Sequence, residues 1–279
     1  MADSAFQKQY RQEFIAGFEQ KRSLFRATGV TEAVMKGSEA IFLVADTNNA
    51  EAQTRGLNGM IPGRADDLNQ NTCTLVEWHD KVRRSKYNIF ASQGDGRRIM
   101  QEGTIKVLNR KVDALMVTAL STGTNDTGAA ATMSLGLIAK SVAILGQNDV
   151  DVEEEDNMFC ALTPAAHAYL MQVKEFSSAQ YVELKPFGGP AQKMRRWYGI
   201  NFFVSTRLSG MGGAAEKVLM WHRNAIGYAV NTGEMEVDAD YNREESYYWA
   251  RASAFMGAKL LQNAGVVVVN HDGSAYVAS

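Results

Sequence analysis

The stretch DGRRIMQEGTIKVLNRKVDALMVTAL, residues 95–120, decides the fold. Its apolar residues recur at steps of three and four, which places them on one face of an α-helix. These residues are Ile105, Leu108, Val112, Leu115, Met116 and Ala119. The opposite, polar face carries Lys106, Asn109, Arg110 and Asp113. Asp95 can cap the first turn and Gly123 can end the helix. Such a helix is about 37 Å long, and we expect the rest of the chain to be organised around it.

A second amphipathic pattern lies at the amino-terminal end of the chain. Aromatic residues recur there every four positions, at Phe6, Tyr10, Phe14 and Phe18, among charged ones. The pattern predicts a helix over residues 5–26. This helix packs either on its own domain or, as an arm, on a neighbouring chain.

A long polar segment joins the next two strand candidates. Residues 41–45 form a short apolar strand candidate, and residues 46–72 are polar and rich in Asn and Gly. Strand character returns at 74–78 and continues at 82–90. Connections of this length are usually functional, disordered or ordered by a partner. We therefore predict a long hairpin that projects from the subunit.

The returning strand of this hairpin is basic. After Trp78 it carries Lys81, Arg83, Arg84 and Lys86. One interpretation is an edge strand that is protected from aggregation by its charge. The other is a basic arm that meets acidic groups on another subunit, with these residues as intersubunit contacts.

The middle of the chain alternates strand and helix patterns. The predicted helices are 133–145, 164–173 and 223–230, and the predicted strands are 158–163, 197–205 and 217–221. The alternation predicts one layered α/β unit over about 124–231.

Three further segments end the chain. Residues 234–239 alternate acidic and apolar residues, as in a half-exposed strand, and 265–270 (GVVVVN) form a strong strand candidate. Residues 244–261 are rich in aromatic residues and fit a strand or a helix. We expect these strands to pair with one another and to lie along the long helix.

The composition is that of a globular protein, with 46% apolar and 22% charged residues. A net charge of −2 gives no electrostatic reason to expect wrapping of nucleic acid or adhesion to a membrane. The most apolar helical stretch, 133–145, is too short to cross a bilayer. Cys73 and Cys160 lie far apart in the sequence and suit a reducing compartment or two inert buried thiols.

No motif in the sequence indicates catalysis. His79, His167, His222 and His271 have no second ligand at zinc-binding spacing. The small-residue loop 121–131 lacks the Gly-Lys-Ser/Thr of a phosphate-binding loop, and no Gly-x-Ser-x-Gly elbow occurs. The Gly-Met-Gly-Gly stretch at 210–213 is interpreted as a turn. We therefore expect no catalytic, cofactor or metal site.

The order of these segments resembles that of the major capsid protein of tailed bacteriophages, the Hong Kong 97-type fold. The carboxy-terminal third carries the closest match: MEVDAD (235–240), ESYYWARASAFMGAKL (245–260) and AGVVVVN (264–270). The stretch MFCALTPAAHAYLM (158–171) is similar to the strand–Pro–helix passage of that family.

The resemblance implies an α+β protein with five parts. These are an amino-terminal arm (1–37), an extended loop or long β-hairpin (38–90), a peripheral domain with a long spine helix (91–123), an axial α/β domain (124–232) and returning strands of the peripheral domain (233–279). The implied function is structural and not enzymatic. Copies would assemble into the hexamers and pentamers of an icosahedral shell around double-stranded DNA.

The implied partners follow from that role. They are other copies of the chain, a separate scaffolding protein, a portal protein, a decoration protein, and packaged double-stranded DNA contacted non-specifically. The chain would be made in the cytoplasm of the bacterial host and end in the virion. Some relatives form an isopeptide bond between a Lys and an Asn of two subunits, and neither position can be matched here.

Two alternatives remain open at this stage. An encapsulin-type nanocompartment has the same fold but carries enzymatic cargo, and neighbouring genes would distinguish it from a virus. A soluble α/β enzyme built on residues 124–231 belongs to a different class. It would be a monomer with a deep pocket lined by ionisable groups of perturbed pKa.

Overall fold

The computed structural model describes residues 23–34, 37–46, 51–55, 58–61, 67–85, 96–153, 156–177, 195–231 and 236–277. The aromatic residues of the predicted amino-terminal helix, Phe6, Tyr10, Phe14 and Phe18, lie outside the described residues, as do Lys86 and Asp95.

The described residues form two five-stranded sheets and a separate hairpin. The first sheet contains β1 (Val30–Val34), β9 (Ile226–Asn231), β11 (Tyr247–Leu260) and β10 (Glu236–Asn242), with β4 (Val76–Ser85) paired to the other side of β11. The second has the order β12 (Val266–His271), β8 (Glu216–His222), β5 (Met158–Leu162), β7 (Ile200–Val204), β6 (Arg195–Trp197). The hairpin pairs β2 (Glu39–Asp46) with β3 (Asp67–Thr74).

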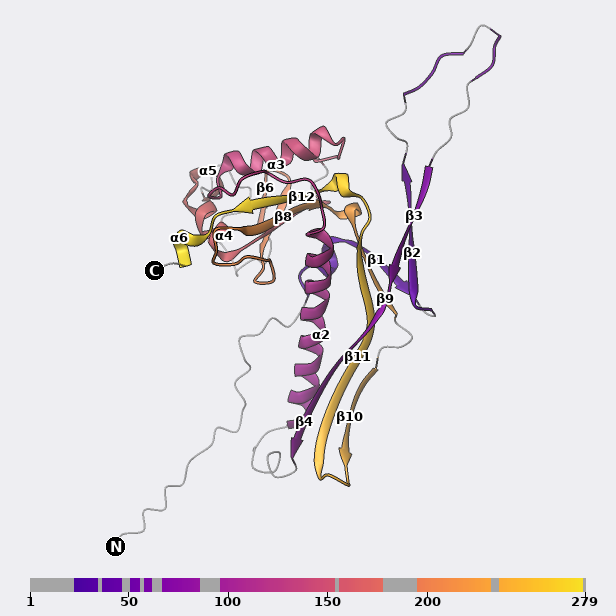
Figure 1. Ribbon diagram of the computed structural model, residues 1–279, viewed down its shortest axis with the longest axis vertical. Helices are drawn as coiled ribbons and strands as arrows, with labels where there is room; N and C mark the ends of the chain where they lie inside the picture. The colour runs from indigo at the N-terminus through magenta and orange to yellow at the C-terminus, as the bar shows by residue number, and fades with distance from the viewer. Residues whose placement is uncertain are drawn as a thin grey trace.

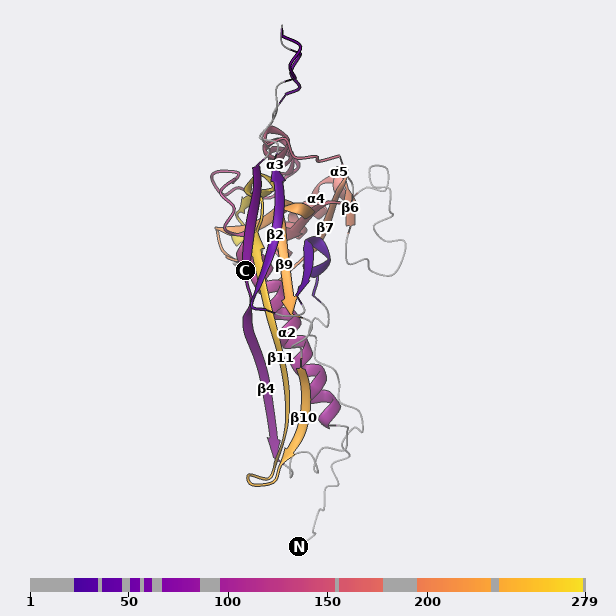
Figure 2. The same cartoon turned by 90° about the vertical axis from the view of Figure 1, so that its right-hand side faces the viewer.

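The helices are unequal in length and role. They are α2 (Gly96–Leu120), α3 (Leu135–Gln147), α4 (Pro164–Gln172), α5 (Lys174–Ser177) and α6 (Ser274–Val277), with short 3-10 turns at Arg26–Thr28, Arg223–Ala225 and Asn263–Gly265. Figure 1 shows α2 beside β4 and β11, and the second sheet with α3 and α4 beyond one end of α2. The β2–β3 hairpin projects on the other side, and Figure 2 shows that β4, β11 and β10 run side by side.

The long helix predicted from the periodicity is present as α2. Two of its residues lie on a different face from the one predicted. Ile105, expected on the apolar face, is 44% exposed, whereas Asp113, expected on the polar face, is 1% exposed. The carboxylate of Asp113 accepts hydrogen bonds from the Ser23 hydroxyl, from Leu24 N (3.5 Å) and from Phe25 N (3.3 Å). Residues 23–25 therefore cover Asp113, in the carboxy-terminal half of α2, and bury its carboxylate.

The second sheet is buried on both faces, which explains its continuous apolar strands. Alternate residues of β5, β8 and β12 enter two different cores. One core surrounds Trp221, which stacks on Phe25 with ring centroids 5.6 Å apart. The other lies under α3 and α4 and contains Met158, Phe202 and Met220. Thr163 caps α4 by accepting a hydrogen bond from Ala166 N at 3.2 Å, and Pro164 follows it in the first turn.

Two of the predicted elements and one predicted strand pairing were wrong. Residues 67–72, expected in a loop, belong to β3, because pairing with β2 satisfies their backbone. Residues 226–230, expected to be helical, form β9, because β1 and β11 pair with it on its two sides. The final strand β12 does not pair with β10 or β11. It turns away after Leu260 and pairs with β8, where its valines complete the buried sheet.

No helix in the described part of the chain is long and apolar enough to cross a membrane.

Candidate interaction surfaces

The sheet formed by β10, β11 and β4 has one face on α2 and one face outward. Exposure alternates along β4 because successive side chains of a strand point to opposite faces. Trp78 packs against the core that α2 shares, and the Lys111 ammonium of α2 lies 3.6 Å from the centroid of its ring. Trp78, Asp80 and Arg84 are therefore on the helix side of β4, and Lys81 and Arg83 are on the outward side.

The outward cations of β4 lie over aromatic rings of β11. Lys81 Nζ is 5.2 Å from the centroid of Trp249, and the Arg83 guanidinium is 5.2 Å from that of Tyr247. Such cation–π contacts orient the side chains without neutralising their charge. No carboxylate among the described residues forms an ion pair with either cation. Both charges therefore remain available to a partner.

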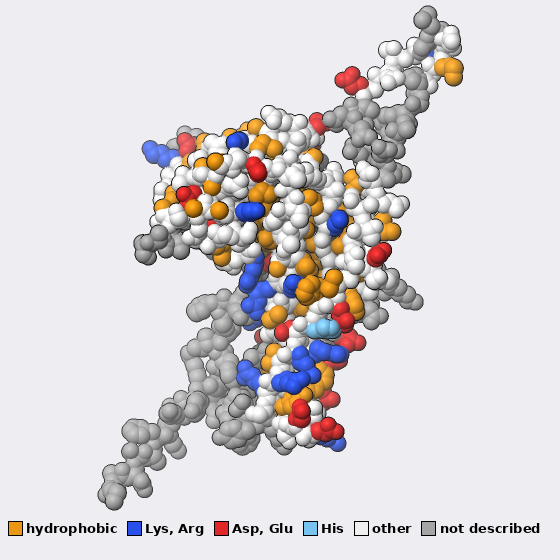
Figure 3. Space-filling view, in the orientation of Figure 1, with side chains coloured by type: hydrophobic (Ala, Val, Ile, Leu, Met, Phe, Trp, Pro, Cys, Tyr) orange, Lys and Arg blue, Asp and Glu red, His pale blue; other side chains and the backbone are white. Residues whose placement is uncertain are grey.

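The opposite edge of the same face is acidic. Glu236, Asp238 and Asp240 of β10 lie opposite Ser253, Arg251 and Trp249 of β11 and share the outward face. Arg251 Nη2 lies 2.7 Å from Glu236 Oε2 and 3.4 Å from Asp238 Oδ2. Figure 3 shows basic side chains gathered over β4 and acidic ones along the side where β10 lies.

The β2–β3 hairpin exposes two apolar side chains on its outer face. Ala40 and Phe42 point inward against Ala229. Ile41 and Leu43, between and beyond them, are 54% and 69% exposed. Their register partners on β3 are polar, so the outer face is mixed, with one small apolar spot that a neighbouring copy could cover.

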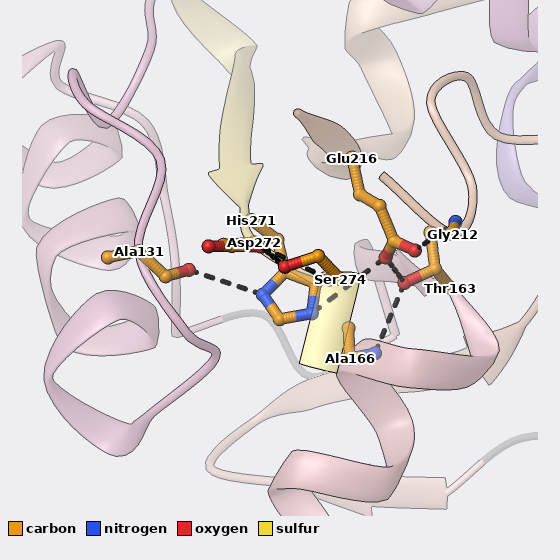
Figure 4. Close-up of polar contacts among 8 residues, drawn as sticks. All are labelled: Ala131, Thr163, Ala166, Gly212, Glu216, His271, Asp272 and Ser274. Carbon is orange, nitrogen blue, oxygen red and sulfur yellow. Dashed lines mark hydrogen bonds and ion pairs between the residues drawn. The ribbon is translucent and has the colours of Figure 1, made fainter. Parts of the chain in front are cut away.

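A buried polar cluster lies in the second sheet, around Glu216 of β8 and His271 of β12 (Figure 4). The carboxylate of Glu216 accepts hydrogen bonds from the Thr163 hydroxyl and from Gly212 N, the latter at 2.6 Å. His271 Nε2 lies 3.8 Å from Glu216 Oε2. Because the Ala131 carbonyl can only accept, His271 Nδ1, 3.2 Å away, donates to it. The cluster joins β8, β12, the start of α4 and two loops, and its burial closes it to substrates.

Three further titratable groups in the interior, two thiols and a phenol, are inert. Burial raises the pKa of the Cys160 thiol and, with partial opposition from Lys259, that of the Cys73 thiol. Burial raises the pKa of Tyr228 to about 12, although Arg26 acts in the opposite direction. All three therefore stay protonated near neutral pH. In the part of the chain that the structure describes, no three His, Cys, Asp or Glu side chains gather to hold a metal ion.

The comparison with protein families decides the identity of the chain. The model of the phage capsid protein family matches residues 2–273. This chain belongs to that family.

The fold of this capsid protein agrees with the assignment. It is similar to a chain in a solved structure of Mycobacterium phage Che8 (TM-score 0.73, 13% identity, 96% of this chain and 98% of that one covered). It is also similar to a capsid chain of cyanophage P-SCSP1u (TM-score 0.71, 13% identity, 96% and 93% covered). These likenesses confirm the α+β Hong Kong 97-type capsid fold. A search among curated proteins gives no match.

The structure divides the contact residues that the sequence indicated in the capsid protein. Lys81 and Arg83 lie together on the outward face, whereas Trp78 and Arg84 face α2; Phe6, Tyr10, Phe14, Phe18 and Lys86 lie outside the described residues. Sequence reasoning missed the acidic edge. The alternation in EVDAD was the signal for it, since it places three carboxylates on one face. The Glu216 cluster had no such signal, because its members are far apart in the chain.

Proposed function

We propose that this protein is the major capsid protein of a tailed bacteriophage. Its copies form hexamers and pentamers of an icosahedral shell that encloses double-stranded DNA. The match to the phage capsid protein family over residues 2–273 carries this proposal. The described surfaces support it, because the projecting hairpin and the charged sheet face suit repeated contacts between copies.

The five parts expected from the sequence remain our proposed organisation: arm 1–37, extended loop 38–90, spine helix region 91–123, axial domain 124–232 and returning strands 233–279. Strand pairing supports two exchanges between them. β9 pairs with β1 and β11 and fits the peripheral domain, whereas β12 pairs with β8 and fits the axial domain. The chain therefore crosses between the two domains more often than the linear boundaries imply.

The proposed role is structural, without enzymatic activity or a cofactor. We infer a virion location, with synthesis in the cytoplasm of the bacterial host. The other proposed partners are a separate scaffolding protein, a portal protein, a decoration protein, and DNA contacted non-specifically. The near-neutral net charge of −2 supports the assembly of many copies into one shell, because it limits repulsion between them.

Electron microscopy and light scattering of the purified protein test the proposal. We expect rings or closed shells of many subunits, either from the protein alone or with its scaffolding protein. A stable monomer at high concentration, in several salt conditions and with the scaffold present, would contradict it. Closed shells that contain a cargo enzyme and exclude DNA would identify a nanocompartment instead.

A further inference from the structure

Two free strand edges flank β11 in the outward sheet. β4 and β10 lie on opposite sides of β11 and both pair with it antiparallel, so they run parallel to each other (Figure 2). Among the described residues, neither strand pairs with any strand other than β11. The same face of the same sheet therefore ends in an open edge on each side.

Charge is ordered row by row across this sheet. The register aligns Lys81 with Arg251 and Asp238 in one row. In the next row it aligns Arg83 with Trp249 and Asp240. Directly opposed residues share a face, so each row carries a cation at the β4 edge and a carboxylate at the β10 edge.

These opposite charges cannot pair within one copy. Two strand spacings separate β4 from β10, which is about 10 Å. At physiological salt, exposed charges at that separation are largely screened, since the screening length is about 8 Å. Arg251 is paired with Glu236 and Asp238, but Asp240 has no ion pair among the described residues, and neither do Lys81 and Arg83.

We propose that the β4 edge of one copy docks beside the β10 edge of a second copy, with both outward faces on the same side. Lys81 of the first copy then meets the partner subunit's Asp238, and Arg83 meets the partner subunit's Asp240. Such a contact is head-to-tail. Each added copy leaves one free basic edge and one free acidic edge, so the contact repeats. This inference rests on the proposed shell function, because it names the carboxylates that the basic strand meets.

The same charge pattern disfavours contacts between two identical edges. Two β4 edges would bring together the cations Lys81 and Arg83, and two β10 edges would bring together carboxylates. Repulsion between like charges disfavours both pairings, so the charges select the head-to-tail arrangement and its register. They act during docking more than they add affinity, so the wild-type assembly rate should fall as salt rises.

Charge exchange tests the contact. One variant carries Lys81→Glu and Arg83→Glu, a second carries Asp238→Lys and Asp240→Lys, and a third combines all four changes. We expect each double variant to form shells roughly ten-fold more slowly than wild type, as electrostatic steering is lost. The combined variant should recover most of the wild-type rate, because it exchanges the two edges.

A matched control has the same change in net charge elsewhere. Lys174→Glu with Arg207→Glu reverses two exposed cations outside this sheet, one in α5 and one between β7 and β8, and should assemble at the wild-type rate. Circular dichroism and the thermal midpoint of every variant establish that each remains folded.

Three outcomes would contradict the inference. Wild-type shell formation by Lys81→Glu with Arg83→Glu would overturn the contact and leave the shell function intact. The double variants could also stay folded and assemble slowly while the combined variant assembles no faster. That result would mean that β4 contacts a surface other than β10. A wild-type protein that forms no shell would overturn the proposed function itself.

Discussion

The two sheets of this capsid protein differ in how many of their faces are buried. The sheet of β12, β8, β5, β7 and β6 has a hydrophobic core on each face and holds the fully buried Trp221. The sheet of β10, β11 and β4 has α2 on one face and leaves charged residues on the other. The comparison teaches that stability and contact chemistry are separated in space, so the first sheet should tolerate little change and the second should tolerate much.

A tryptophan in each sheet gives the largest expected contrast. Trp221 packs on Phe25, Phe159 and Phe203 and donates from Nε1 to the Thr28 carbonyl at 3.1 Å. Trp221→Ala should lower the free energy of unfolding by about 4 kcal/mol. Trp249→Ala, in the half-exposed sheet, should cost about 1 kcal/mol. Urea unfolding of both variants measures the difference, and equal losses would break the comparison.

One glutamate from each sheet allows the same comparison for a charged side chain. Glu216→Ala removes the acceptor that Thr163 and Gly212 N use and should cost about 3 kcal/mol. Glu236→Ala removes only an exposed ion pair with Arg251 and should cost about 0.5 kcal/mol. Thermal unfolding compares the two. A loss below about 1 kcal/mol for Glu216→Ala would show that the buried cluster is not needed for stability.

Two glycines should respond with opposite signs. A Cβ at Gly257 of β11 would lie 2.6 Å from the Thr74 carbonyl oxygen, where β11 passes the end of β3. Gly257→Ala should therefore destabilise the protein by about 2 kcal/mol. At Gly103 of α2 no atom of the described residues lies within 4 Å of such a Cβ, and Gly103→Ala should stabilise the helix by about 1 kcal/mol. If Gly103→Ala also destabilised the protein, a group would have to pack against Gly103 in the amino-terminal half of α2.

The smallest expected effect is a pH dependence of stability, which arises from Asp80 on the helix side of β4. Burial raises the pKa of Asp80, with partial opposition from Arg110, and Asp80 Oδ2 accepts no hydrogen bond from the described residues. Because the folded-state pKa is above its unfolded value of 3.8, the folded state binds the proton more tightly. Stability therefore decreases as pH rises through the interval between the two values.

Asp80→Asn should remove this pH-dependent loss. Compared with wild type, the variant should have a slightly higher thermal midpoint at neutral pH and the same midpoint below the unfolded pKa. Asp238→Asn, on the exposed acidic edge, serves as the control without such a rise. A lower midpoint of Asp80→Asn at neutral pH would contradict the argument.

The sequence allowed prediction of the elements whose pattern is local. The steps of three and four in α2 and the valines of β12 lie within one segment, so periodicity found them. The strand β9 was missed because its two neighbours, β1 and β11, decide its conformation, and both are distant in the chain. Polar β3 was missed for the same reason, since its ladder with β2 outweighs the low strand preference of Asn and Gln.

The candidate site shows the same limit. The cations at 81 and 83 were visible in the sequence, but their separation from Arg84 required the pleat of a placed strand. Asp113 was assigned to a solvent-facing side because its partners, Ser23 to Phe25, lie at the far end of the chain. Contacts made by residues distant in sequence leave no periodic signal, and these contacts are the ones that bury charge here.

The opposed edges of the outward sheet impose a counting rule on rings of mixed copies. If the contact runs around a ring, a copy with a reversed basic edge docks fastest with a neighbour that has a reversed acidic edge. The two kinds then alternate, and an alternating ring closes only with an even number of members. An equal mixture should therefore complete hexamers faster than pentamers. Without pentamers a hexagonal lattice does not close, so the mixture should give more flat sheets or open tubes, and fewer shells, than the wild-type protein.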